Sequence, residues 1–179
     1  YKRQELHLGT SSWSFPGWAG IVYAREASER LLAQEGLGAY AEHPLMRTVG
    51  LDRTYYGPID AVAFRRYADA VPSNFRFLVK GFGELLLSRF PNHPRYAERR
   101  GMENRSFLDP ELATRDVVEP YVEGLGALGG VLLFQFPPQR VAGGPPSFVR
   151  RLREFLEALP RGPTYAVEVR NPEFVTRHY

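Results

Sequence analysis

The sequence contains no cysteine, and this absence removes several kinds of chemistry at once. Disulfide bonds, cysteine nucleophiles and thiolate metal sites are all excluded. No apolar run is long enough to cross a membrane, and the N-terminal stretch lacks the apolar core of a secretory signal. These absences predict a cytoplasmic protein that does not enter membranes.

Lysine is scarce, because only Lys2 and Lys80 are lysines among the 23 basic residues. Such a ratio is typical of a GC-rich, bacterial-type genome, in which exposed lysines drift to arginine. Lys80 is therefore notable, since it ends the apolar stretch FRFLVKG. The formal net charge is only +3 and the arginines are spread along the chain, which argues against a nucleic acid as the partner.

The common cofactor and nucleophile motifs are missing as well. The sequence has no GxGxxG, Walker A or GxSxG pattern, so no nucleotide cofactor is predicted. The histidines do not show the spacing of metal ligands; they are His7, His43, His93 and His178. A divalent cation held by the carboxylate oxygens of Asp52 and Glu168 stays open as a cofactor.

Short apolar strands alternate with amphipathic helices along the chain. Strands are predicted at 6–11, 48–56, 75–81, 129–136 and 164–170. Helices are predicted at 28–43, 60–71, from Asp109-Pro110 to the glycines at 124–129, and at 148–159, with N-caps Ser28, Asp60, Asp109 and Ser147. Gly36 and Gly38 are expected to interrupt the first helix, and 82–108 to be a long loop with one short helix. The alternation predicts an α/β fold of parallel strands covered by helices.

Polar side chains gather at the carboxyl ends of these strands. Every second side chain of a strand faces the same side of the sheet. Five polar residues therefore lie on the face opposite to the apolar side chains of their strands: Asp52, Lys80, Gln135, Glu168 and Arg170. Because ligands bind at the carboxyl ends of parallel strands, these residues predict a shared polar site. The alternative is a structural ion pair that seals the top of the core.

Five stretches resemble the DUF72, or YecE-like, family, in the family's order: GTSSW (9–13), TYY (54–56), FRFLVKG (75–81), LLFQFPP (132–138) and AVEVRNPEF (166–174). The resemblance spans nearly the whole chain and implies a TIM-type (β/α) barrel, in a family whose biochemical function is not established. The chain departs from the family at Gly50 and Asp52, lacks a threonine–histidine pair after the third strand, and has Asn171 where histidine is common. These departures argue against histidine-dependent chemistry.

The resemblance also raises a question of length. A TIM barrel has eight strand–helix units in about 250 residues, whereas this sequence provides about five units in 179 residues. We therefore expect a single DUF72-like domain at 1–179 that is incomplete as a barrel and forms the N-terminal part of a longer one. Five strands cannot close, so an unpaired strand edge is expected.

The leading hypothesis is an enzyme that acts on a small polar metabolite, such as a sugar or a sugar phosphate. The predicted catalytic residues are Lys80, Glu168 and Asp52, with Lys80 as an electrophilic cation or Schiff-base amine and a carboxylate as general base or metal ligand. The predicted substrate-binding residues are Arg170, Gln135, Asn171, Tyr56 and Trp13. Arg170 would clamp an anionic group. Trp13 would stack on a ligand ring, with packing at the rim as the alternative.

Two other classes of function stay open. A non-catalytic barrel could keep the same pocket for binding or regulation by a metabolite. Nucleic-acid processing ranks third, and it rests on the sequence pI of about 9.3 and on the arginine-rich loop 89–105.

Overall fold

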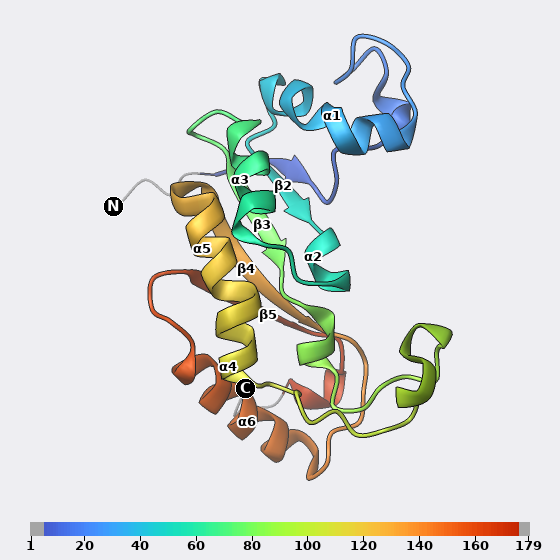
Figure 1. The fold of residues 1–179 in the computed structure, drawn as a ribbon, viewed down its shortest axis with the longest axis vertical. Helices are drawn as coiled ribbons and strands as arrows, with labels where there is room; N and C mark the ends of the chain where they lie inside the picture. Colours follow the sequence, from blue (N-terminus) through green and yellow to red (C-terminus); the bar gives the residue numbers. More distant parts are fainter. Residues whose placement is uncertain (1–5, 176–179) are drawn as a thin grey trace.

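The computed structural model describes residues 6–175, so Lys2 and His178 lie outside the described residues. A parallel five-stranded sheet runs through the molecule (Figure 1). The strands are β1 (Gly9–Thr10), β2 (Thr48–Leu51), β3 (Arg76–Lys80), β4 (Gly129–Phe136) and β5 (Thr164–Val169), and they are neighbours in sequence order. Each pair is parallel, as in the wall of a barrel. The predicted α/β fold is confirmed as a partial (β/α) barrel.

The helices pack on one face of this sheet and bury its apolar side chains. They are α1 (Glu29–Glu42), α3 (Ala61–Asp69), the continuous run of α4 (Pro110–Ala113), η4 (Thr114–Val118) and α5 (Glu119–Leu125), and α6 (Gly144–Ala158). Phe77 of β3 contacts Tyr67 of α3, and Phe134 of β4 contacts Phe155 of α6 edge-on. Within residues 6–175, none of these helices combines the length and apolarity that crossing a membrane requires.

Side-chain caps start the helices at three of the four predicted positions. Ser28, Asp60 and Asp109 each accept a hydrogen bond from a backbone N–H of the first turn. The fourth prediction is wrong, because α6 begins at Gly144 and places Ser147 inside the helix. The two prolines before Ser147 fit the first turn, where backbone N–H groups have no helical partner.

Two further expectations about the helices are corrected. α1 continues through Gly36 and Gly38, since tertiary packing outweighs their low helix propensity. The helical period predicts Val62 and Val122 in the buried stripes of α3 and α5, but these residues are 59% and 47% exposed. The reason is the close contact between α3 and α5, in which Gly124 lies directly against Phe64. Each helix buries the side that faces the other helix, and Val62 and Val122 lie outside that contact.

The opposite face of the sheet would be the interior of a closed barrel, and it is only half-buried. Its side chains include Leu78, Lys80, Leu133 and Gln135, whereas their neighbours on the helix-covered face are buried. In the described part of the chain, β5 pairs with β4 alone, so its other edge carries the expected unpaired backbone. The continuation into a longer barrel stays a prediction.

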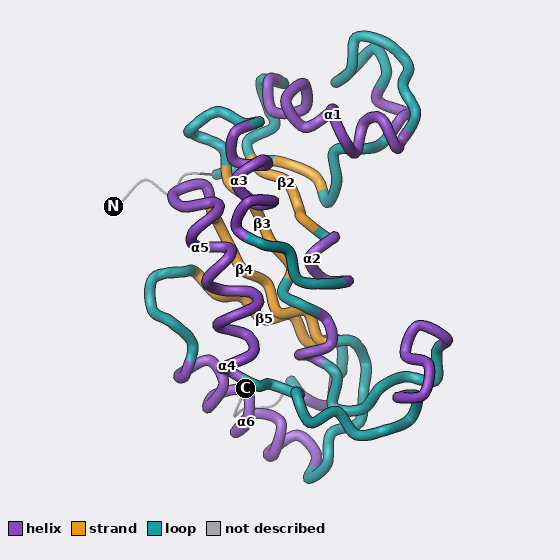
Figure 2. Tube along the Cα trace, viewed as in Figure 1, coloured by secondary structure: helices purple, strands orange, loops and turns teal. Residues whose placement is uncertain are grey.

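Segment 82–108 is a long excursion at the carboxyl end of the sheet and is mostly loop (Figure 2). It holds two short 3-10 turns rather than the one short helix expected, η2 (Gly83–Leu86) and η3 (Pro94–Arg99). The part that projects from the sheet, residues 87–105, is called the arm below. An isolated antiparallel β-bridge between Arg89 and Glu103 joins the segment that leaves the sheet to the segment that returns to it.

Candidate functional site

A sharp change of direction after β2 brings Asp52 to Lys80. The strand predicted to continue to residue 56 ends at Leu51, and α2 (Arg53–Tyr56) follows at once. Asp52 Oδ1 lies 3.0 Å from Nζ of Lys80, whose side chain is 20% exposed. Oδ1 is closed off from solvent and has no well-aligned hydrogen bond, so its contact with Lys80 is mainly Coulombic.

Thr54 explains why the chain turns there. Its buried hydroxyl lies 2.6 Å from the carbonyl oxygen of Lys80 and 2.9 Å from that of Leu51, and it can donate to one of them at a time. The hydroxyl thus ties α2 to the end of β3. Strand propensity of the Thr-Tyr-Tyr stretch is outweighed by this tertiary contact.

We expect Thr54→Val to lower the free energy of unfolding by about 1–2 kcal/mol, because a buried carbonyl loses its donor. Thr54→Ser keeps the hydroxyl and should restore most of the loss. Urea unfolding of the two variants checks this. Equal stability of the valine variant and the parent would show that the hydroxyl does not hold α2 in place.

Glu168 is the centre of a second cluster, on β4 and β5. Gln135 and Glu168 are direct partners in the β4–β5 register, and Gln135 Nε2 donates to Glu168 Oε2 at 2.6 Å. Arg170 Nε donates to the other oxygen, Oε1, at 2.8 Å. Lys80 of β3 is the register partner of Leu133 in β4. Gln135 lies two residues after Leu133 and therefore faces the same side of the sheet as Lys80.

These contacts lower the pKa of Glu168. The hydrogen bond from Arg170 contributes most, followed by that from Gln135; burial opposes them, and the charges of Arg170 and Lys80 lower the pKa further by smaller amounts. Glu168 is therefore a carboxylate at neutral pH, fixed by two donors. Such a group suits accepting hydrogen bonds from ligand hydroxyls better than abstracting protons.

The lowered pKa of Glu168 predicts a pH-dependent contribution to stability. Since the folded pKa lies below the unfolded value of 4.5, the contribution is present above that pH and is lost as pH falls through the folded pKa. Glu168→Gln should cost about 1 kcal/mol or less at pH 7, because the ion pair is partly exposed, and the cost should shrink as pH falls through the folded pKa of Glu168. Thermal unfolding from pH 3 to 7 measures the gap, with exposed Glu154→Gln on α6 as control. A gap that is constant over this range would contradict the assignment.

Three predicted binding residues lie apart from these two clusters. Asn171 is buried and clamps the loop after β4, since it accepts from Gln139 N at 2.8 Å and donates to Gln139 O at 3.1 Å. Trp13 is buried between α1 and α3, where it donates to the Leu32 carbonyl and meets Tyr67 edge-on. Tyr56 is 65% exposed at the end of α2.

The carboxylates proposed for a divalent cation each face a cationic side chain. Asp52 contacts Lys80, and Glu168 contacts Arg170. Among residues 6–175, no three acidic or histidine side chains come together in a geometry that could hold a metal ion. A divalent cation would compete with these two ion pairs, so the residues present fit a charge-paired network better than a metal centre.

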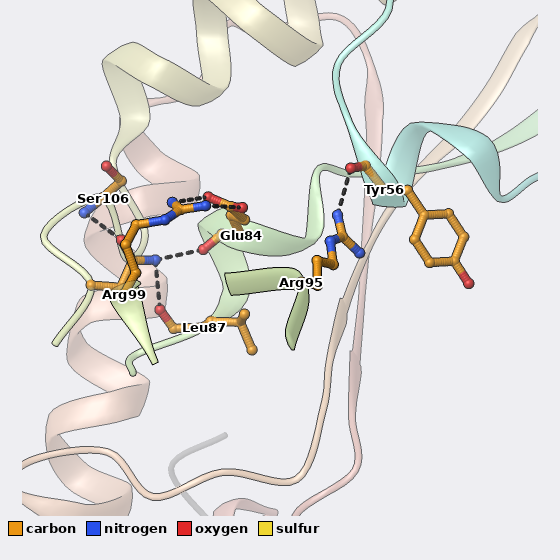
Figure 3. A network of polar contacts seen from close by, with 7 residues as sticks. Tyr56, Glu84, Leu87, Arg95, Arg99 and Ser106 are labelled. Atoms are coloured by element: carbon orange, nitrogen blue, oxygen red, sulfur yellow. Dashed lines mark hydrogen bonds and ion pairs between the residues drawn. The ribbon is translucent and has the colours of Figure 1, made fainter. Parts of the chain in front are cut away.

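The arm supplies residues that the sequence did not single out (Figure 3). Arg99 donates to both carboxylate oxygens of Glu84, at 2.8 and 3.0 Å, and Asn104 Nδ2 donates to the carbonyls of Glu84 and Leu87. These contacts brace the base of the arm. Arg95 reaches back from η3 and donates to the Tyr56 carbonyl, so the arm touches the end of α2. The arm has no regular periodicity, and no sequence signal distinguishes Arg95 from the other arginines of loop 89–105.

One solved structure shares this fold with a TM-score above 0.5. The chain is similar to a DUF72 family protein from Enterococcus faecalis, with 20% identity, a TM-score of 0.57, and coverage of 95% of this chain and 52% of that chain. A DUF72 family protein from Thermotoga maritima shows 25% identity, a TM-score of 0.49, and coverage of 90% and 55%. The chain spans about half the length of these solved structures. No curated protein matches it.

The family assignment covers almost the entire sequence. The family model described as "Protein of unknown function DUF72" matches residues 7–179. All five stretches that carry the resemblance lie inside this range, and the strands β1 to β5 lie inside it as well. The chain therefore belongs to the DUF72 family, whose function is unknown.

Proposed function

We propose that this protein is an enzyme that acts on a small polar metabolite, sugar-like or sugar-phosphate-like, at the carboxyl end of the sheet. One observation carries the proposal: the ends of four neighbouring strands, β2 to β5, place Asp52, Lys80, Gln135 and Glu168 on or beside one half-buried face. Parallel α/β folds bind their ligands at this end of the strands.

Each group has a distinct chemical part in this proposal. The Lys80 ammonium, fixed by Asp52, would stabilise negative charge that develops on a substrate oxygen. The Glu168 carboxylate, held by Gln135 and Arg170, would orient substrate hydroxyls by accepting their hydrogen bonds. Positioning and charge stabilisation, rather than strong proton abstraction by Glu168, are the contributions that this geometry supports.

The lowered pKa of Glu168 also favours a second candidate, a barrel that binds a metabolite without turning it over. A general base works best with a pKa near the working pH, whereas Glu168 is fixed as an anion. Nucleic-acid processing stays a third prediction. It has less support, since Arg99 pairs with Glu84 and Arg89 lies 3.6 Å from Glu103.

A metabolite screen by thermal shift, followed by product analysis of each hit, tests the proposal. We expect sugars or their phosphates to raise the melting temperature and at least one of them to be converted. Stabilisation without conversion would select the binding barrel. Stabilisation by nucleic acid at moderate salt, with no response to metabolites, would overturn both.

A further inference from the structure

Tyr55 lies next to the proposed centre and has no role in it so far. It is one turn beyond Asp52 on α2, and its backbone N–H donates to the Asp52 carbonyl. Its ring lies flat on the backbone after β3, so closely that a Cβ on Gly83 would come within 2.7 Å of Tyr55 Cζ. Across residues 6–175, no protein group hydrogen-bonds to its hydroxyl, which is available to a ligand.

Two arginines from different segments, Arg95 and Arg170, act electrostatically on Tyr55. The guanidinium of Arg95 lies 5.3 Å from the ring centre of Tyr56 and 5.8 Å from that of Tyr96. Arg170 enters from the end of β5. Burial raises the pKa of Tyr55 most and Tyr96 raises it further, while the charges of Arg95 and Arg170 oppose these effects, so the hydroxyl is protonated and can donate at neutral pH.

The cations around Tyr55 outnumber their acidic partners. Lys80 is paired with Asp52, and Arg170 binds Glu168 through Nε alone, which leaves its two Nη nitrogens without a hydrogen bond to the described residues. Among the described residues, the Arg95 side chain has no acidic partner and donates only to the Tyr56 carbonyl. The carboxyl end of the sheet therefore carries one more cation than acidic partners, and two of its guanidinium groups have nitrogens that no described acidic group binds.

The backbone of the arm supports a functional position for Arg95. Ala97, two residues further on, has φ 44° and ψ −119°, a conformation that alanine rarely adopts. Such backbone strain persists where the surroundings impose it, and it gathers at functional sites. Here the bracing of the arm by Glu84 and Arg99 holds η3 over the end of α2.

We propose that Tyr55, Arg95 and Arg170 form an anion-binding subsite that receives the phosphate or carboxylate group of the ligand. The planar guanidinium groups suit both anions, and the tyrosine hydroxyl adds a neutral donor. As the subsite of a substrate, it rests on the proposed function. It specifies that function further, because it selects anionic metabolites over neutral sugars.

The test measures the binding of inorganic phosphate, and separately of acetate, to the whole 179-residue chain by calorimetry. Arg95→Gln should weaken anion binding about ten- to hundredfold, the effect of losing a charged hydrogen bond. Arg100→Gln is the matched control: it removes the same charge from the same arm, and Arg100 donates only to the Ala97 carbonyl. Tyr55→Phe, which keeps the ring, should weaken binding several-fold.

The outcomes separate the subsite from the proposed enzyme. Tighter binding of phosphate than of acetate supports a phosphate ligand, and the reverse supports a carboxylate. The subsite is overturned if the parent protein binds neither anion, or if Arg95→Gln and Tyr55→Phe bind them as the parent does. Arg95-dependent phosphate binding without any converted metabolite would keep the subsite and reject the enzyme.

Discussion

Lys80→Met is expected to abolish the response to the metabolite that stabilises the parent protein, with a loss of affinity of about a hundredfold or more. Lys80 is the cation that ends β3 on the half-buried face, and its contact with Asp52 fixes the ammonium there. Methionine keeps most of the side-chain length and volume but removes the charge. Thermal shift and calorimetry with the best hit of the screen measure the loss.

The fold should survive this change. The Asp52 side chain is partly exposed and can turn to water when Lys80 is replaced. We therefore expect the free energy of unfolding of Lys80→Met to fall by about 1 kcal/mol or less. Arg76→Met is the control, since Arg76 is a cation on the same face at the other end of β3. If Lys80→Met leaves the metabolite response intact, the proposed centre is wrong; if it unfolds the protein, the ion pair is structural.

Regular strands made much of the site predictable. The period of two placed Lys80, Gln135 and Glu168 on one face, and the parallel register made Gln135 and Glu168 direct partners. That reasoning needs only an extended backbone and a buried opposite face. Both conditions hold along β3 and β4, where Phe77, Val79 and the neighbouring large side chains are sealed by the helices.

The same reasoning does not apply where the backbone leaves the strand. Asp52 reaches Lys80 through a helical turn, which depends on the contact of the Thr54 hydroxyl with the end of β3. Asn171 lies just past β5, where alternation no longer applies, and it binds the backbone of Gln139. Arg95 comes from an aperiodic arm whose path depends on long-range contacts that local sequence does not encode.

Gly124→Ala is expected to produce the largest loss of stability among the variants considered, about 2–3 kcal/mol. A Cβ at this position would lie 2.3 Å from Phe64 Cβ and 2.6 Å from the Ala61 carbonyl oxygen. Both are close to the backbone of α3 and cannot move aside without shifting that helix. Alanine is the better helix former by about 1 kcal/mol, but the clash between α3 and α5 outweighs this gain. Chemical unfolding measures the loss.

Gly38→Ala in α1 is the matched control, and it should change stability in the opposite direction. Gly38 is also inside a helix, yet the nearest atom to its added Cβ is the Ala70 carbonyl oxygen at 3.6 Å, an ordinary contact. We expect a gain of about 0.5–1 kcal/mol there, because alanine lowers the entropy of the unfolded chain. Opposite signs for one substitution in two helices would show that packing decides the cost at Gly124. A gain at both positions would mean that α3 and α5 can separate, and that their contact does not set which faces of these helices are buried.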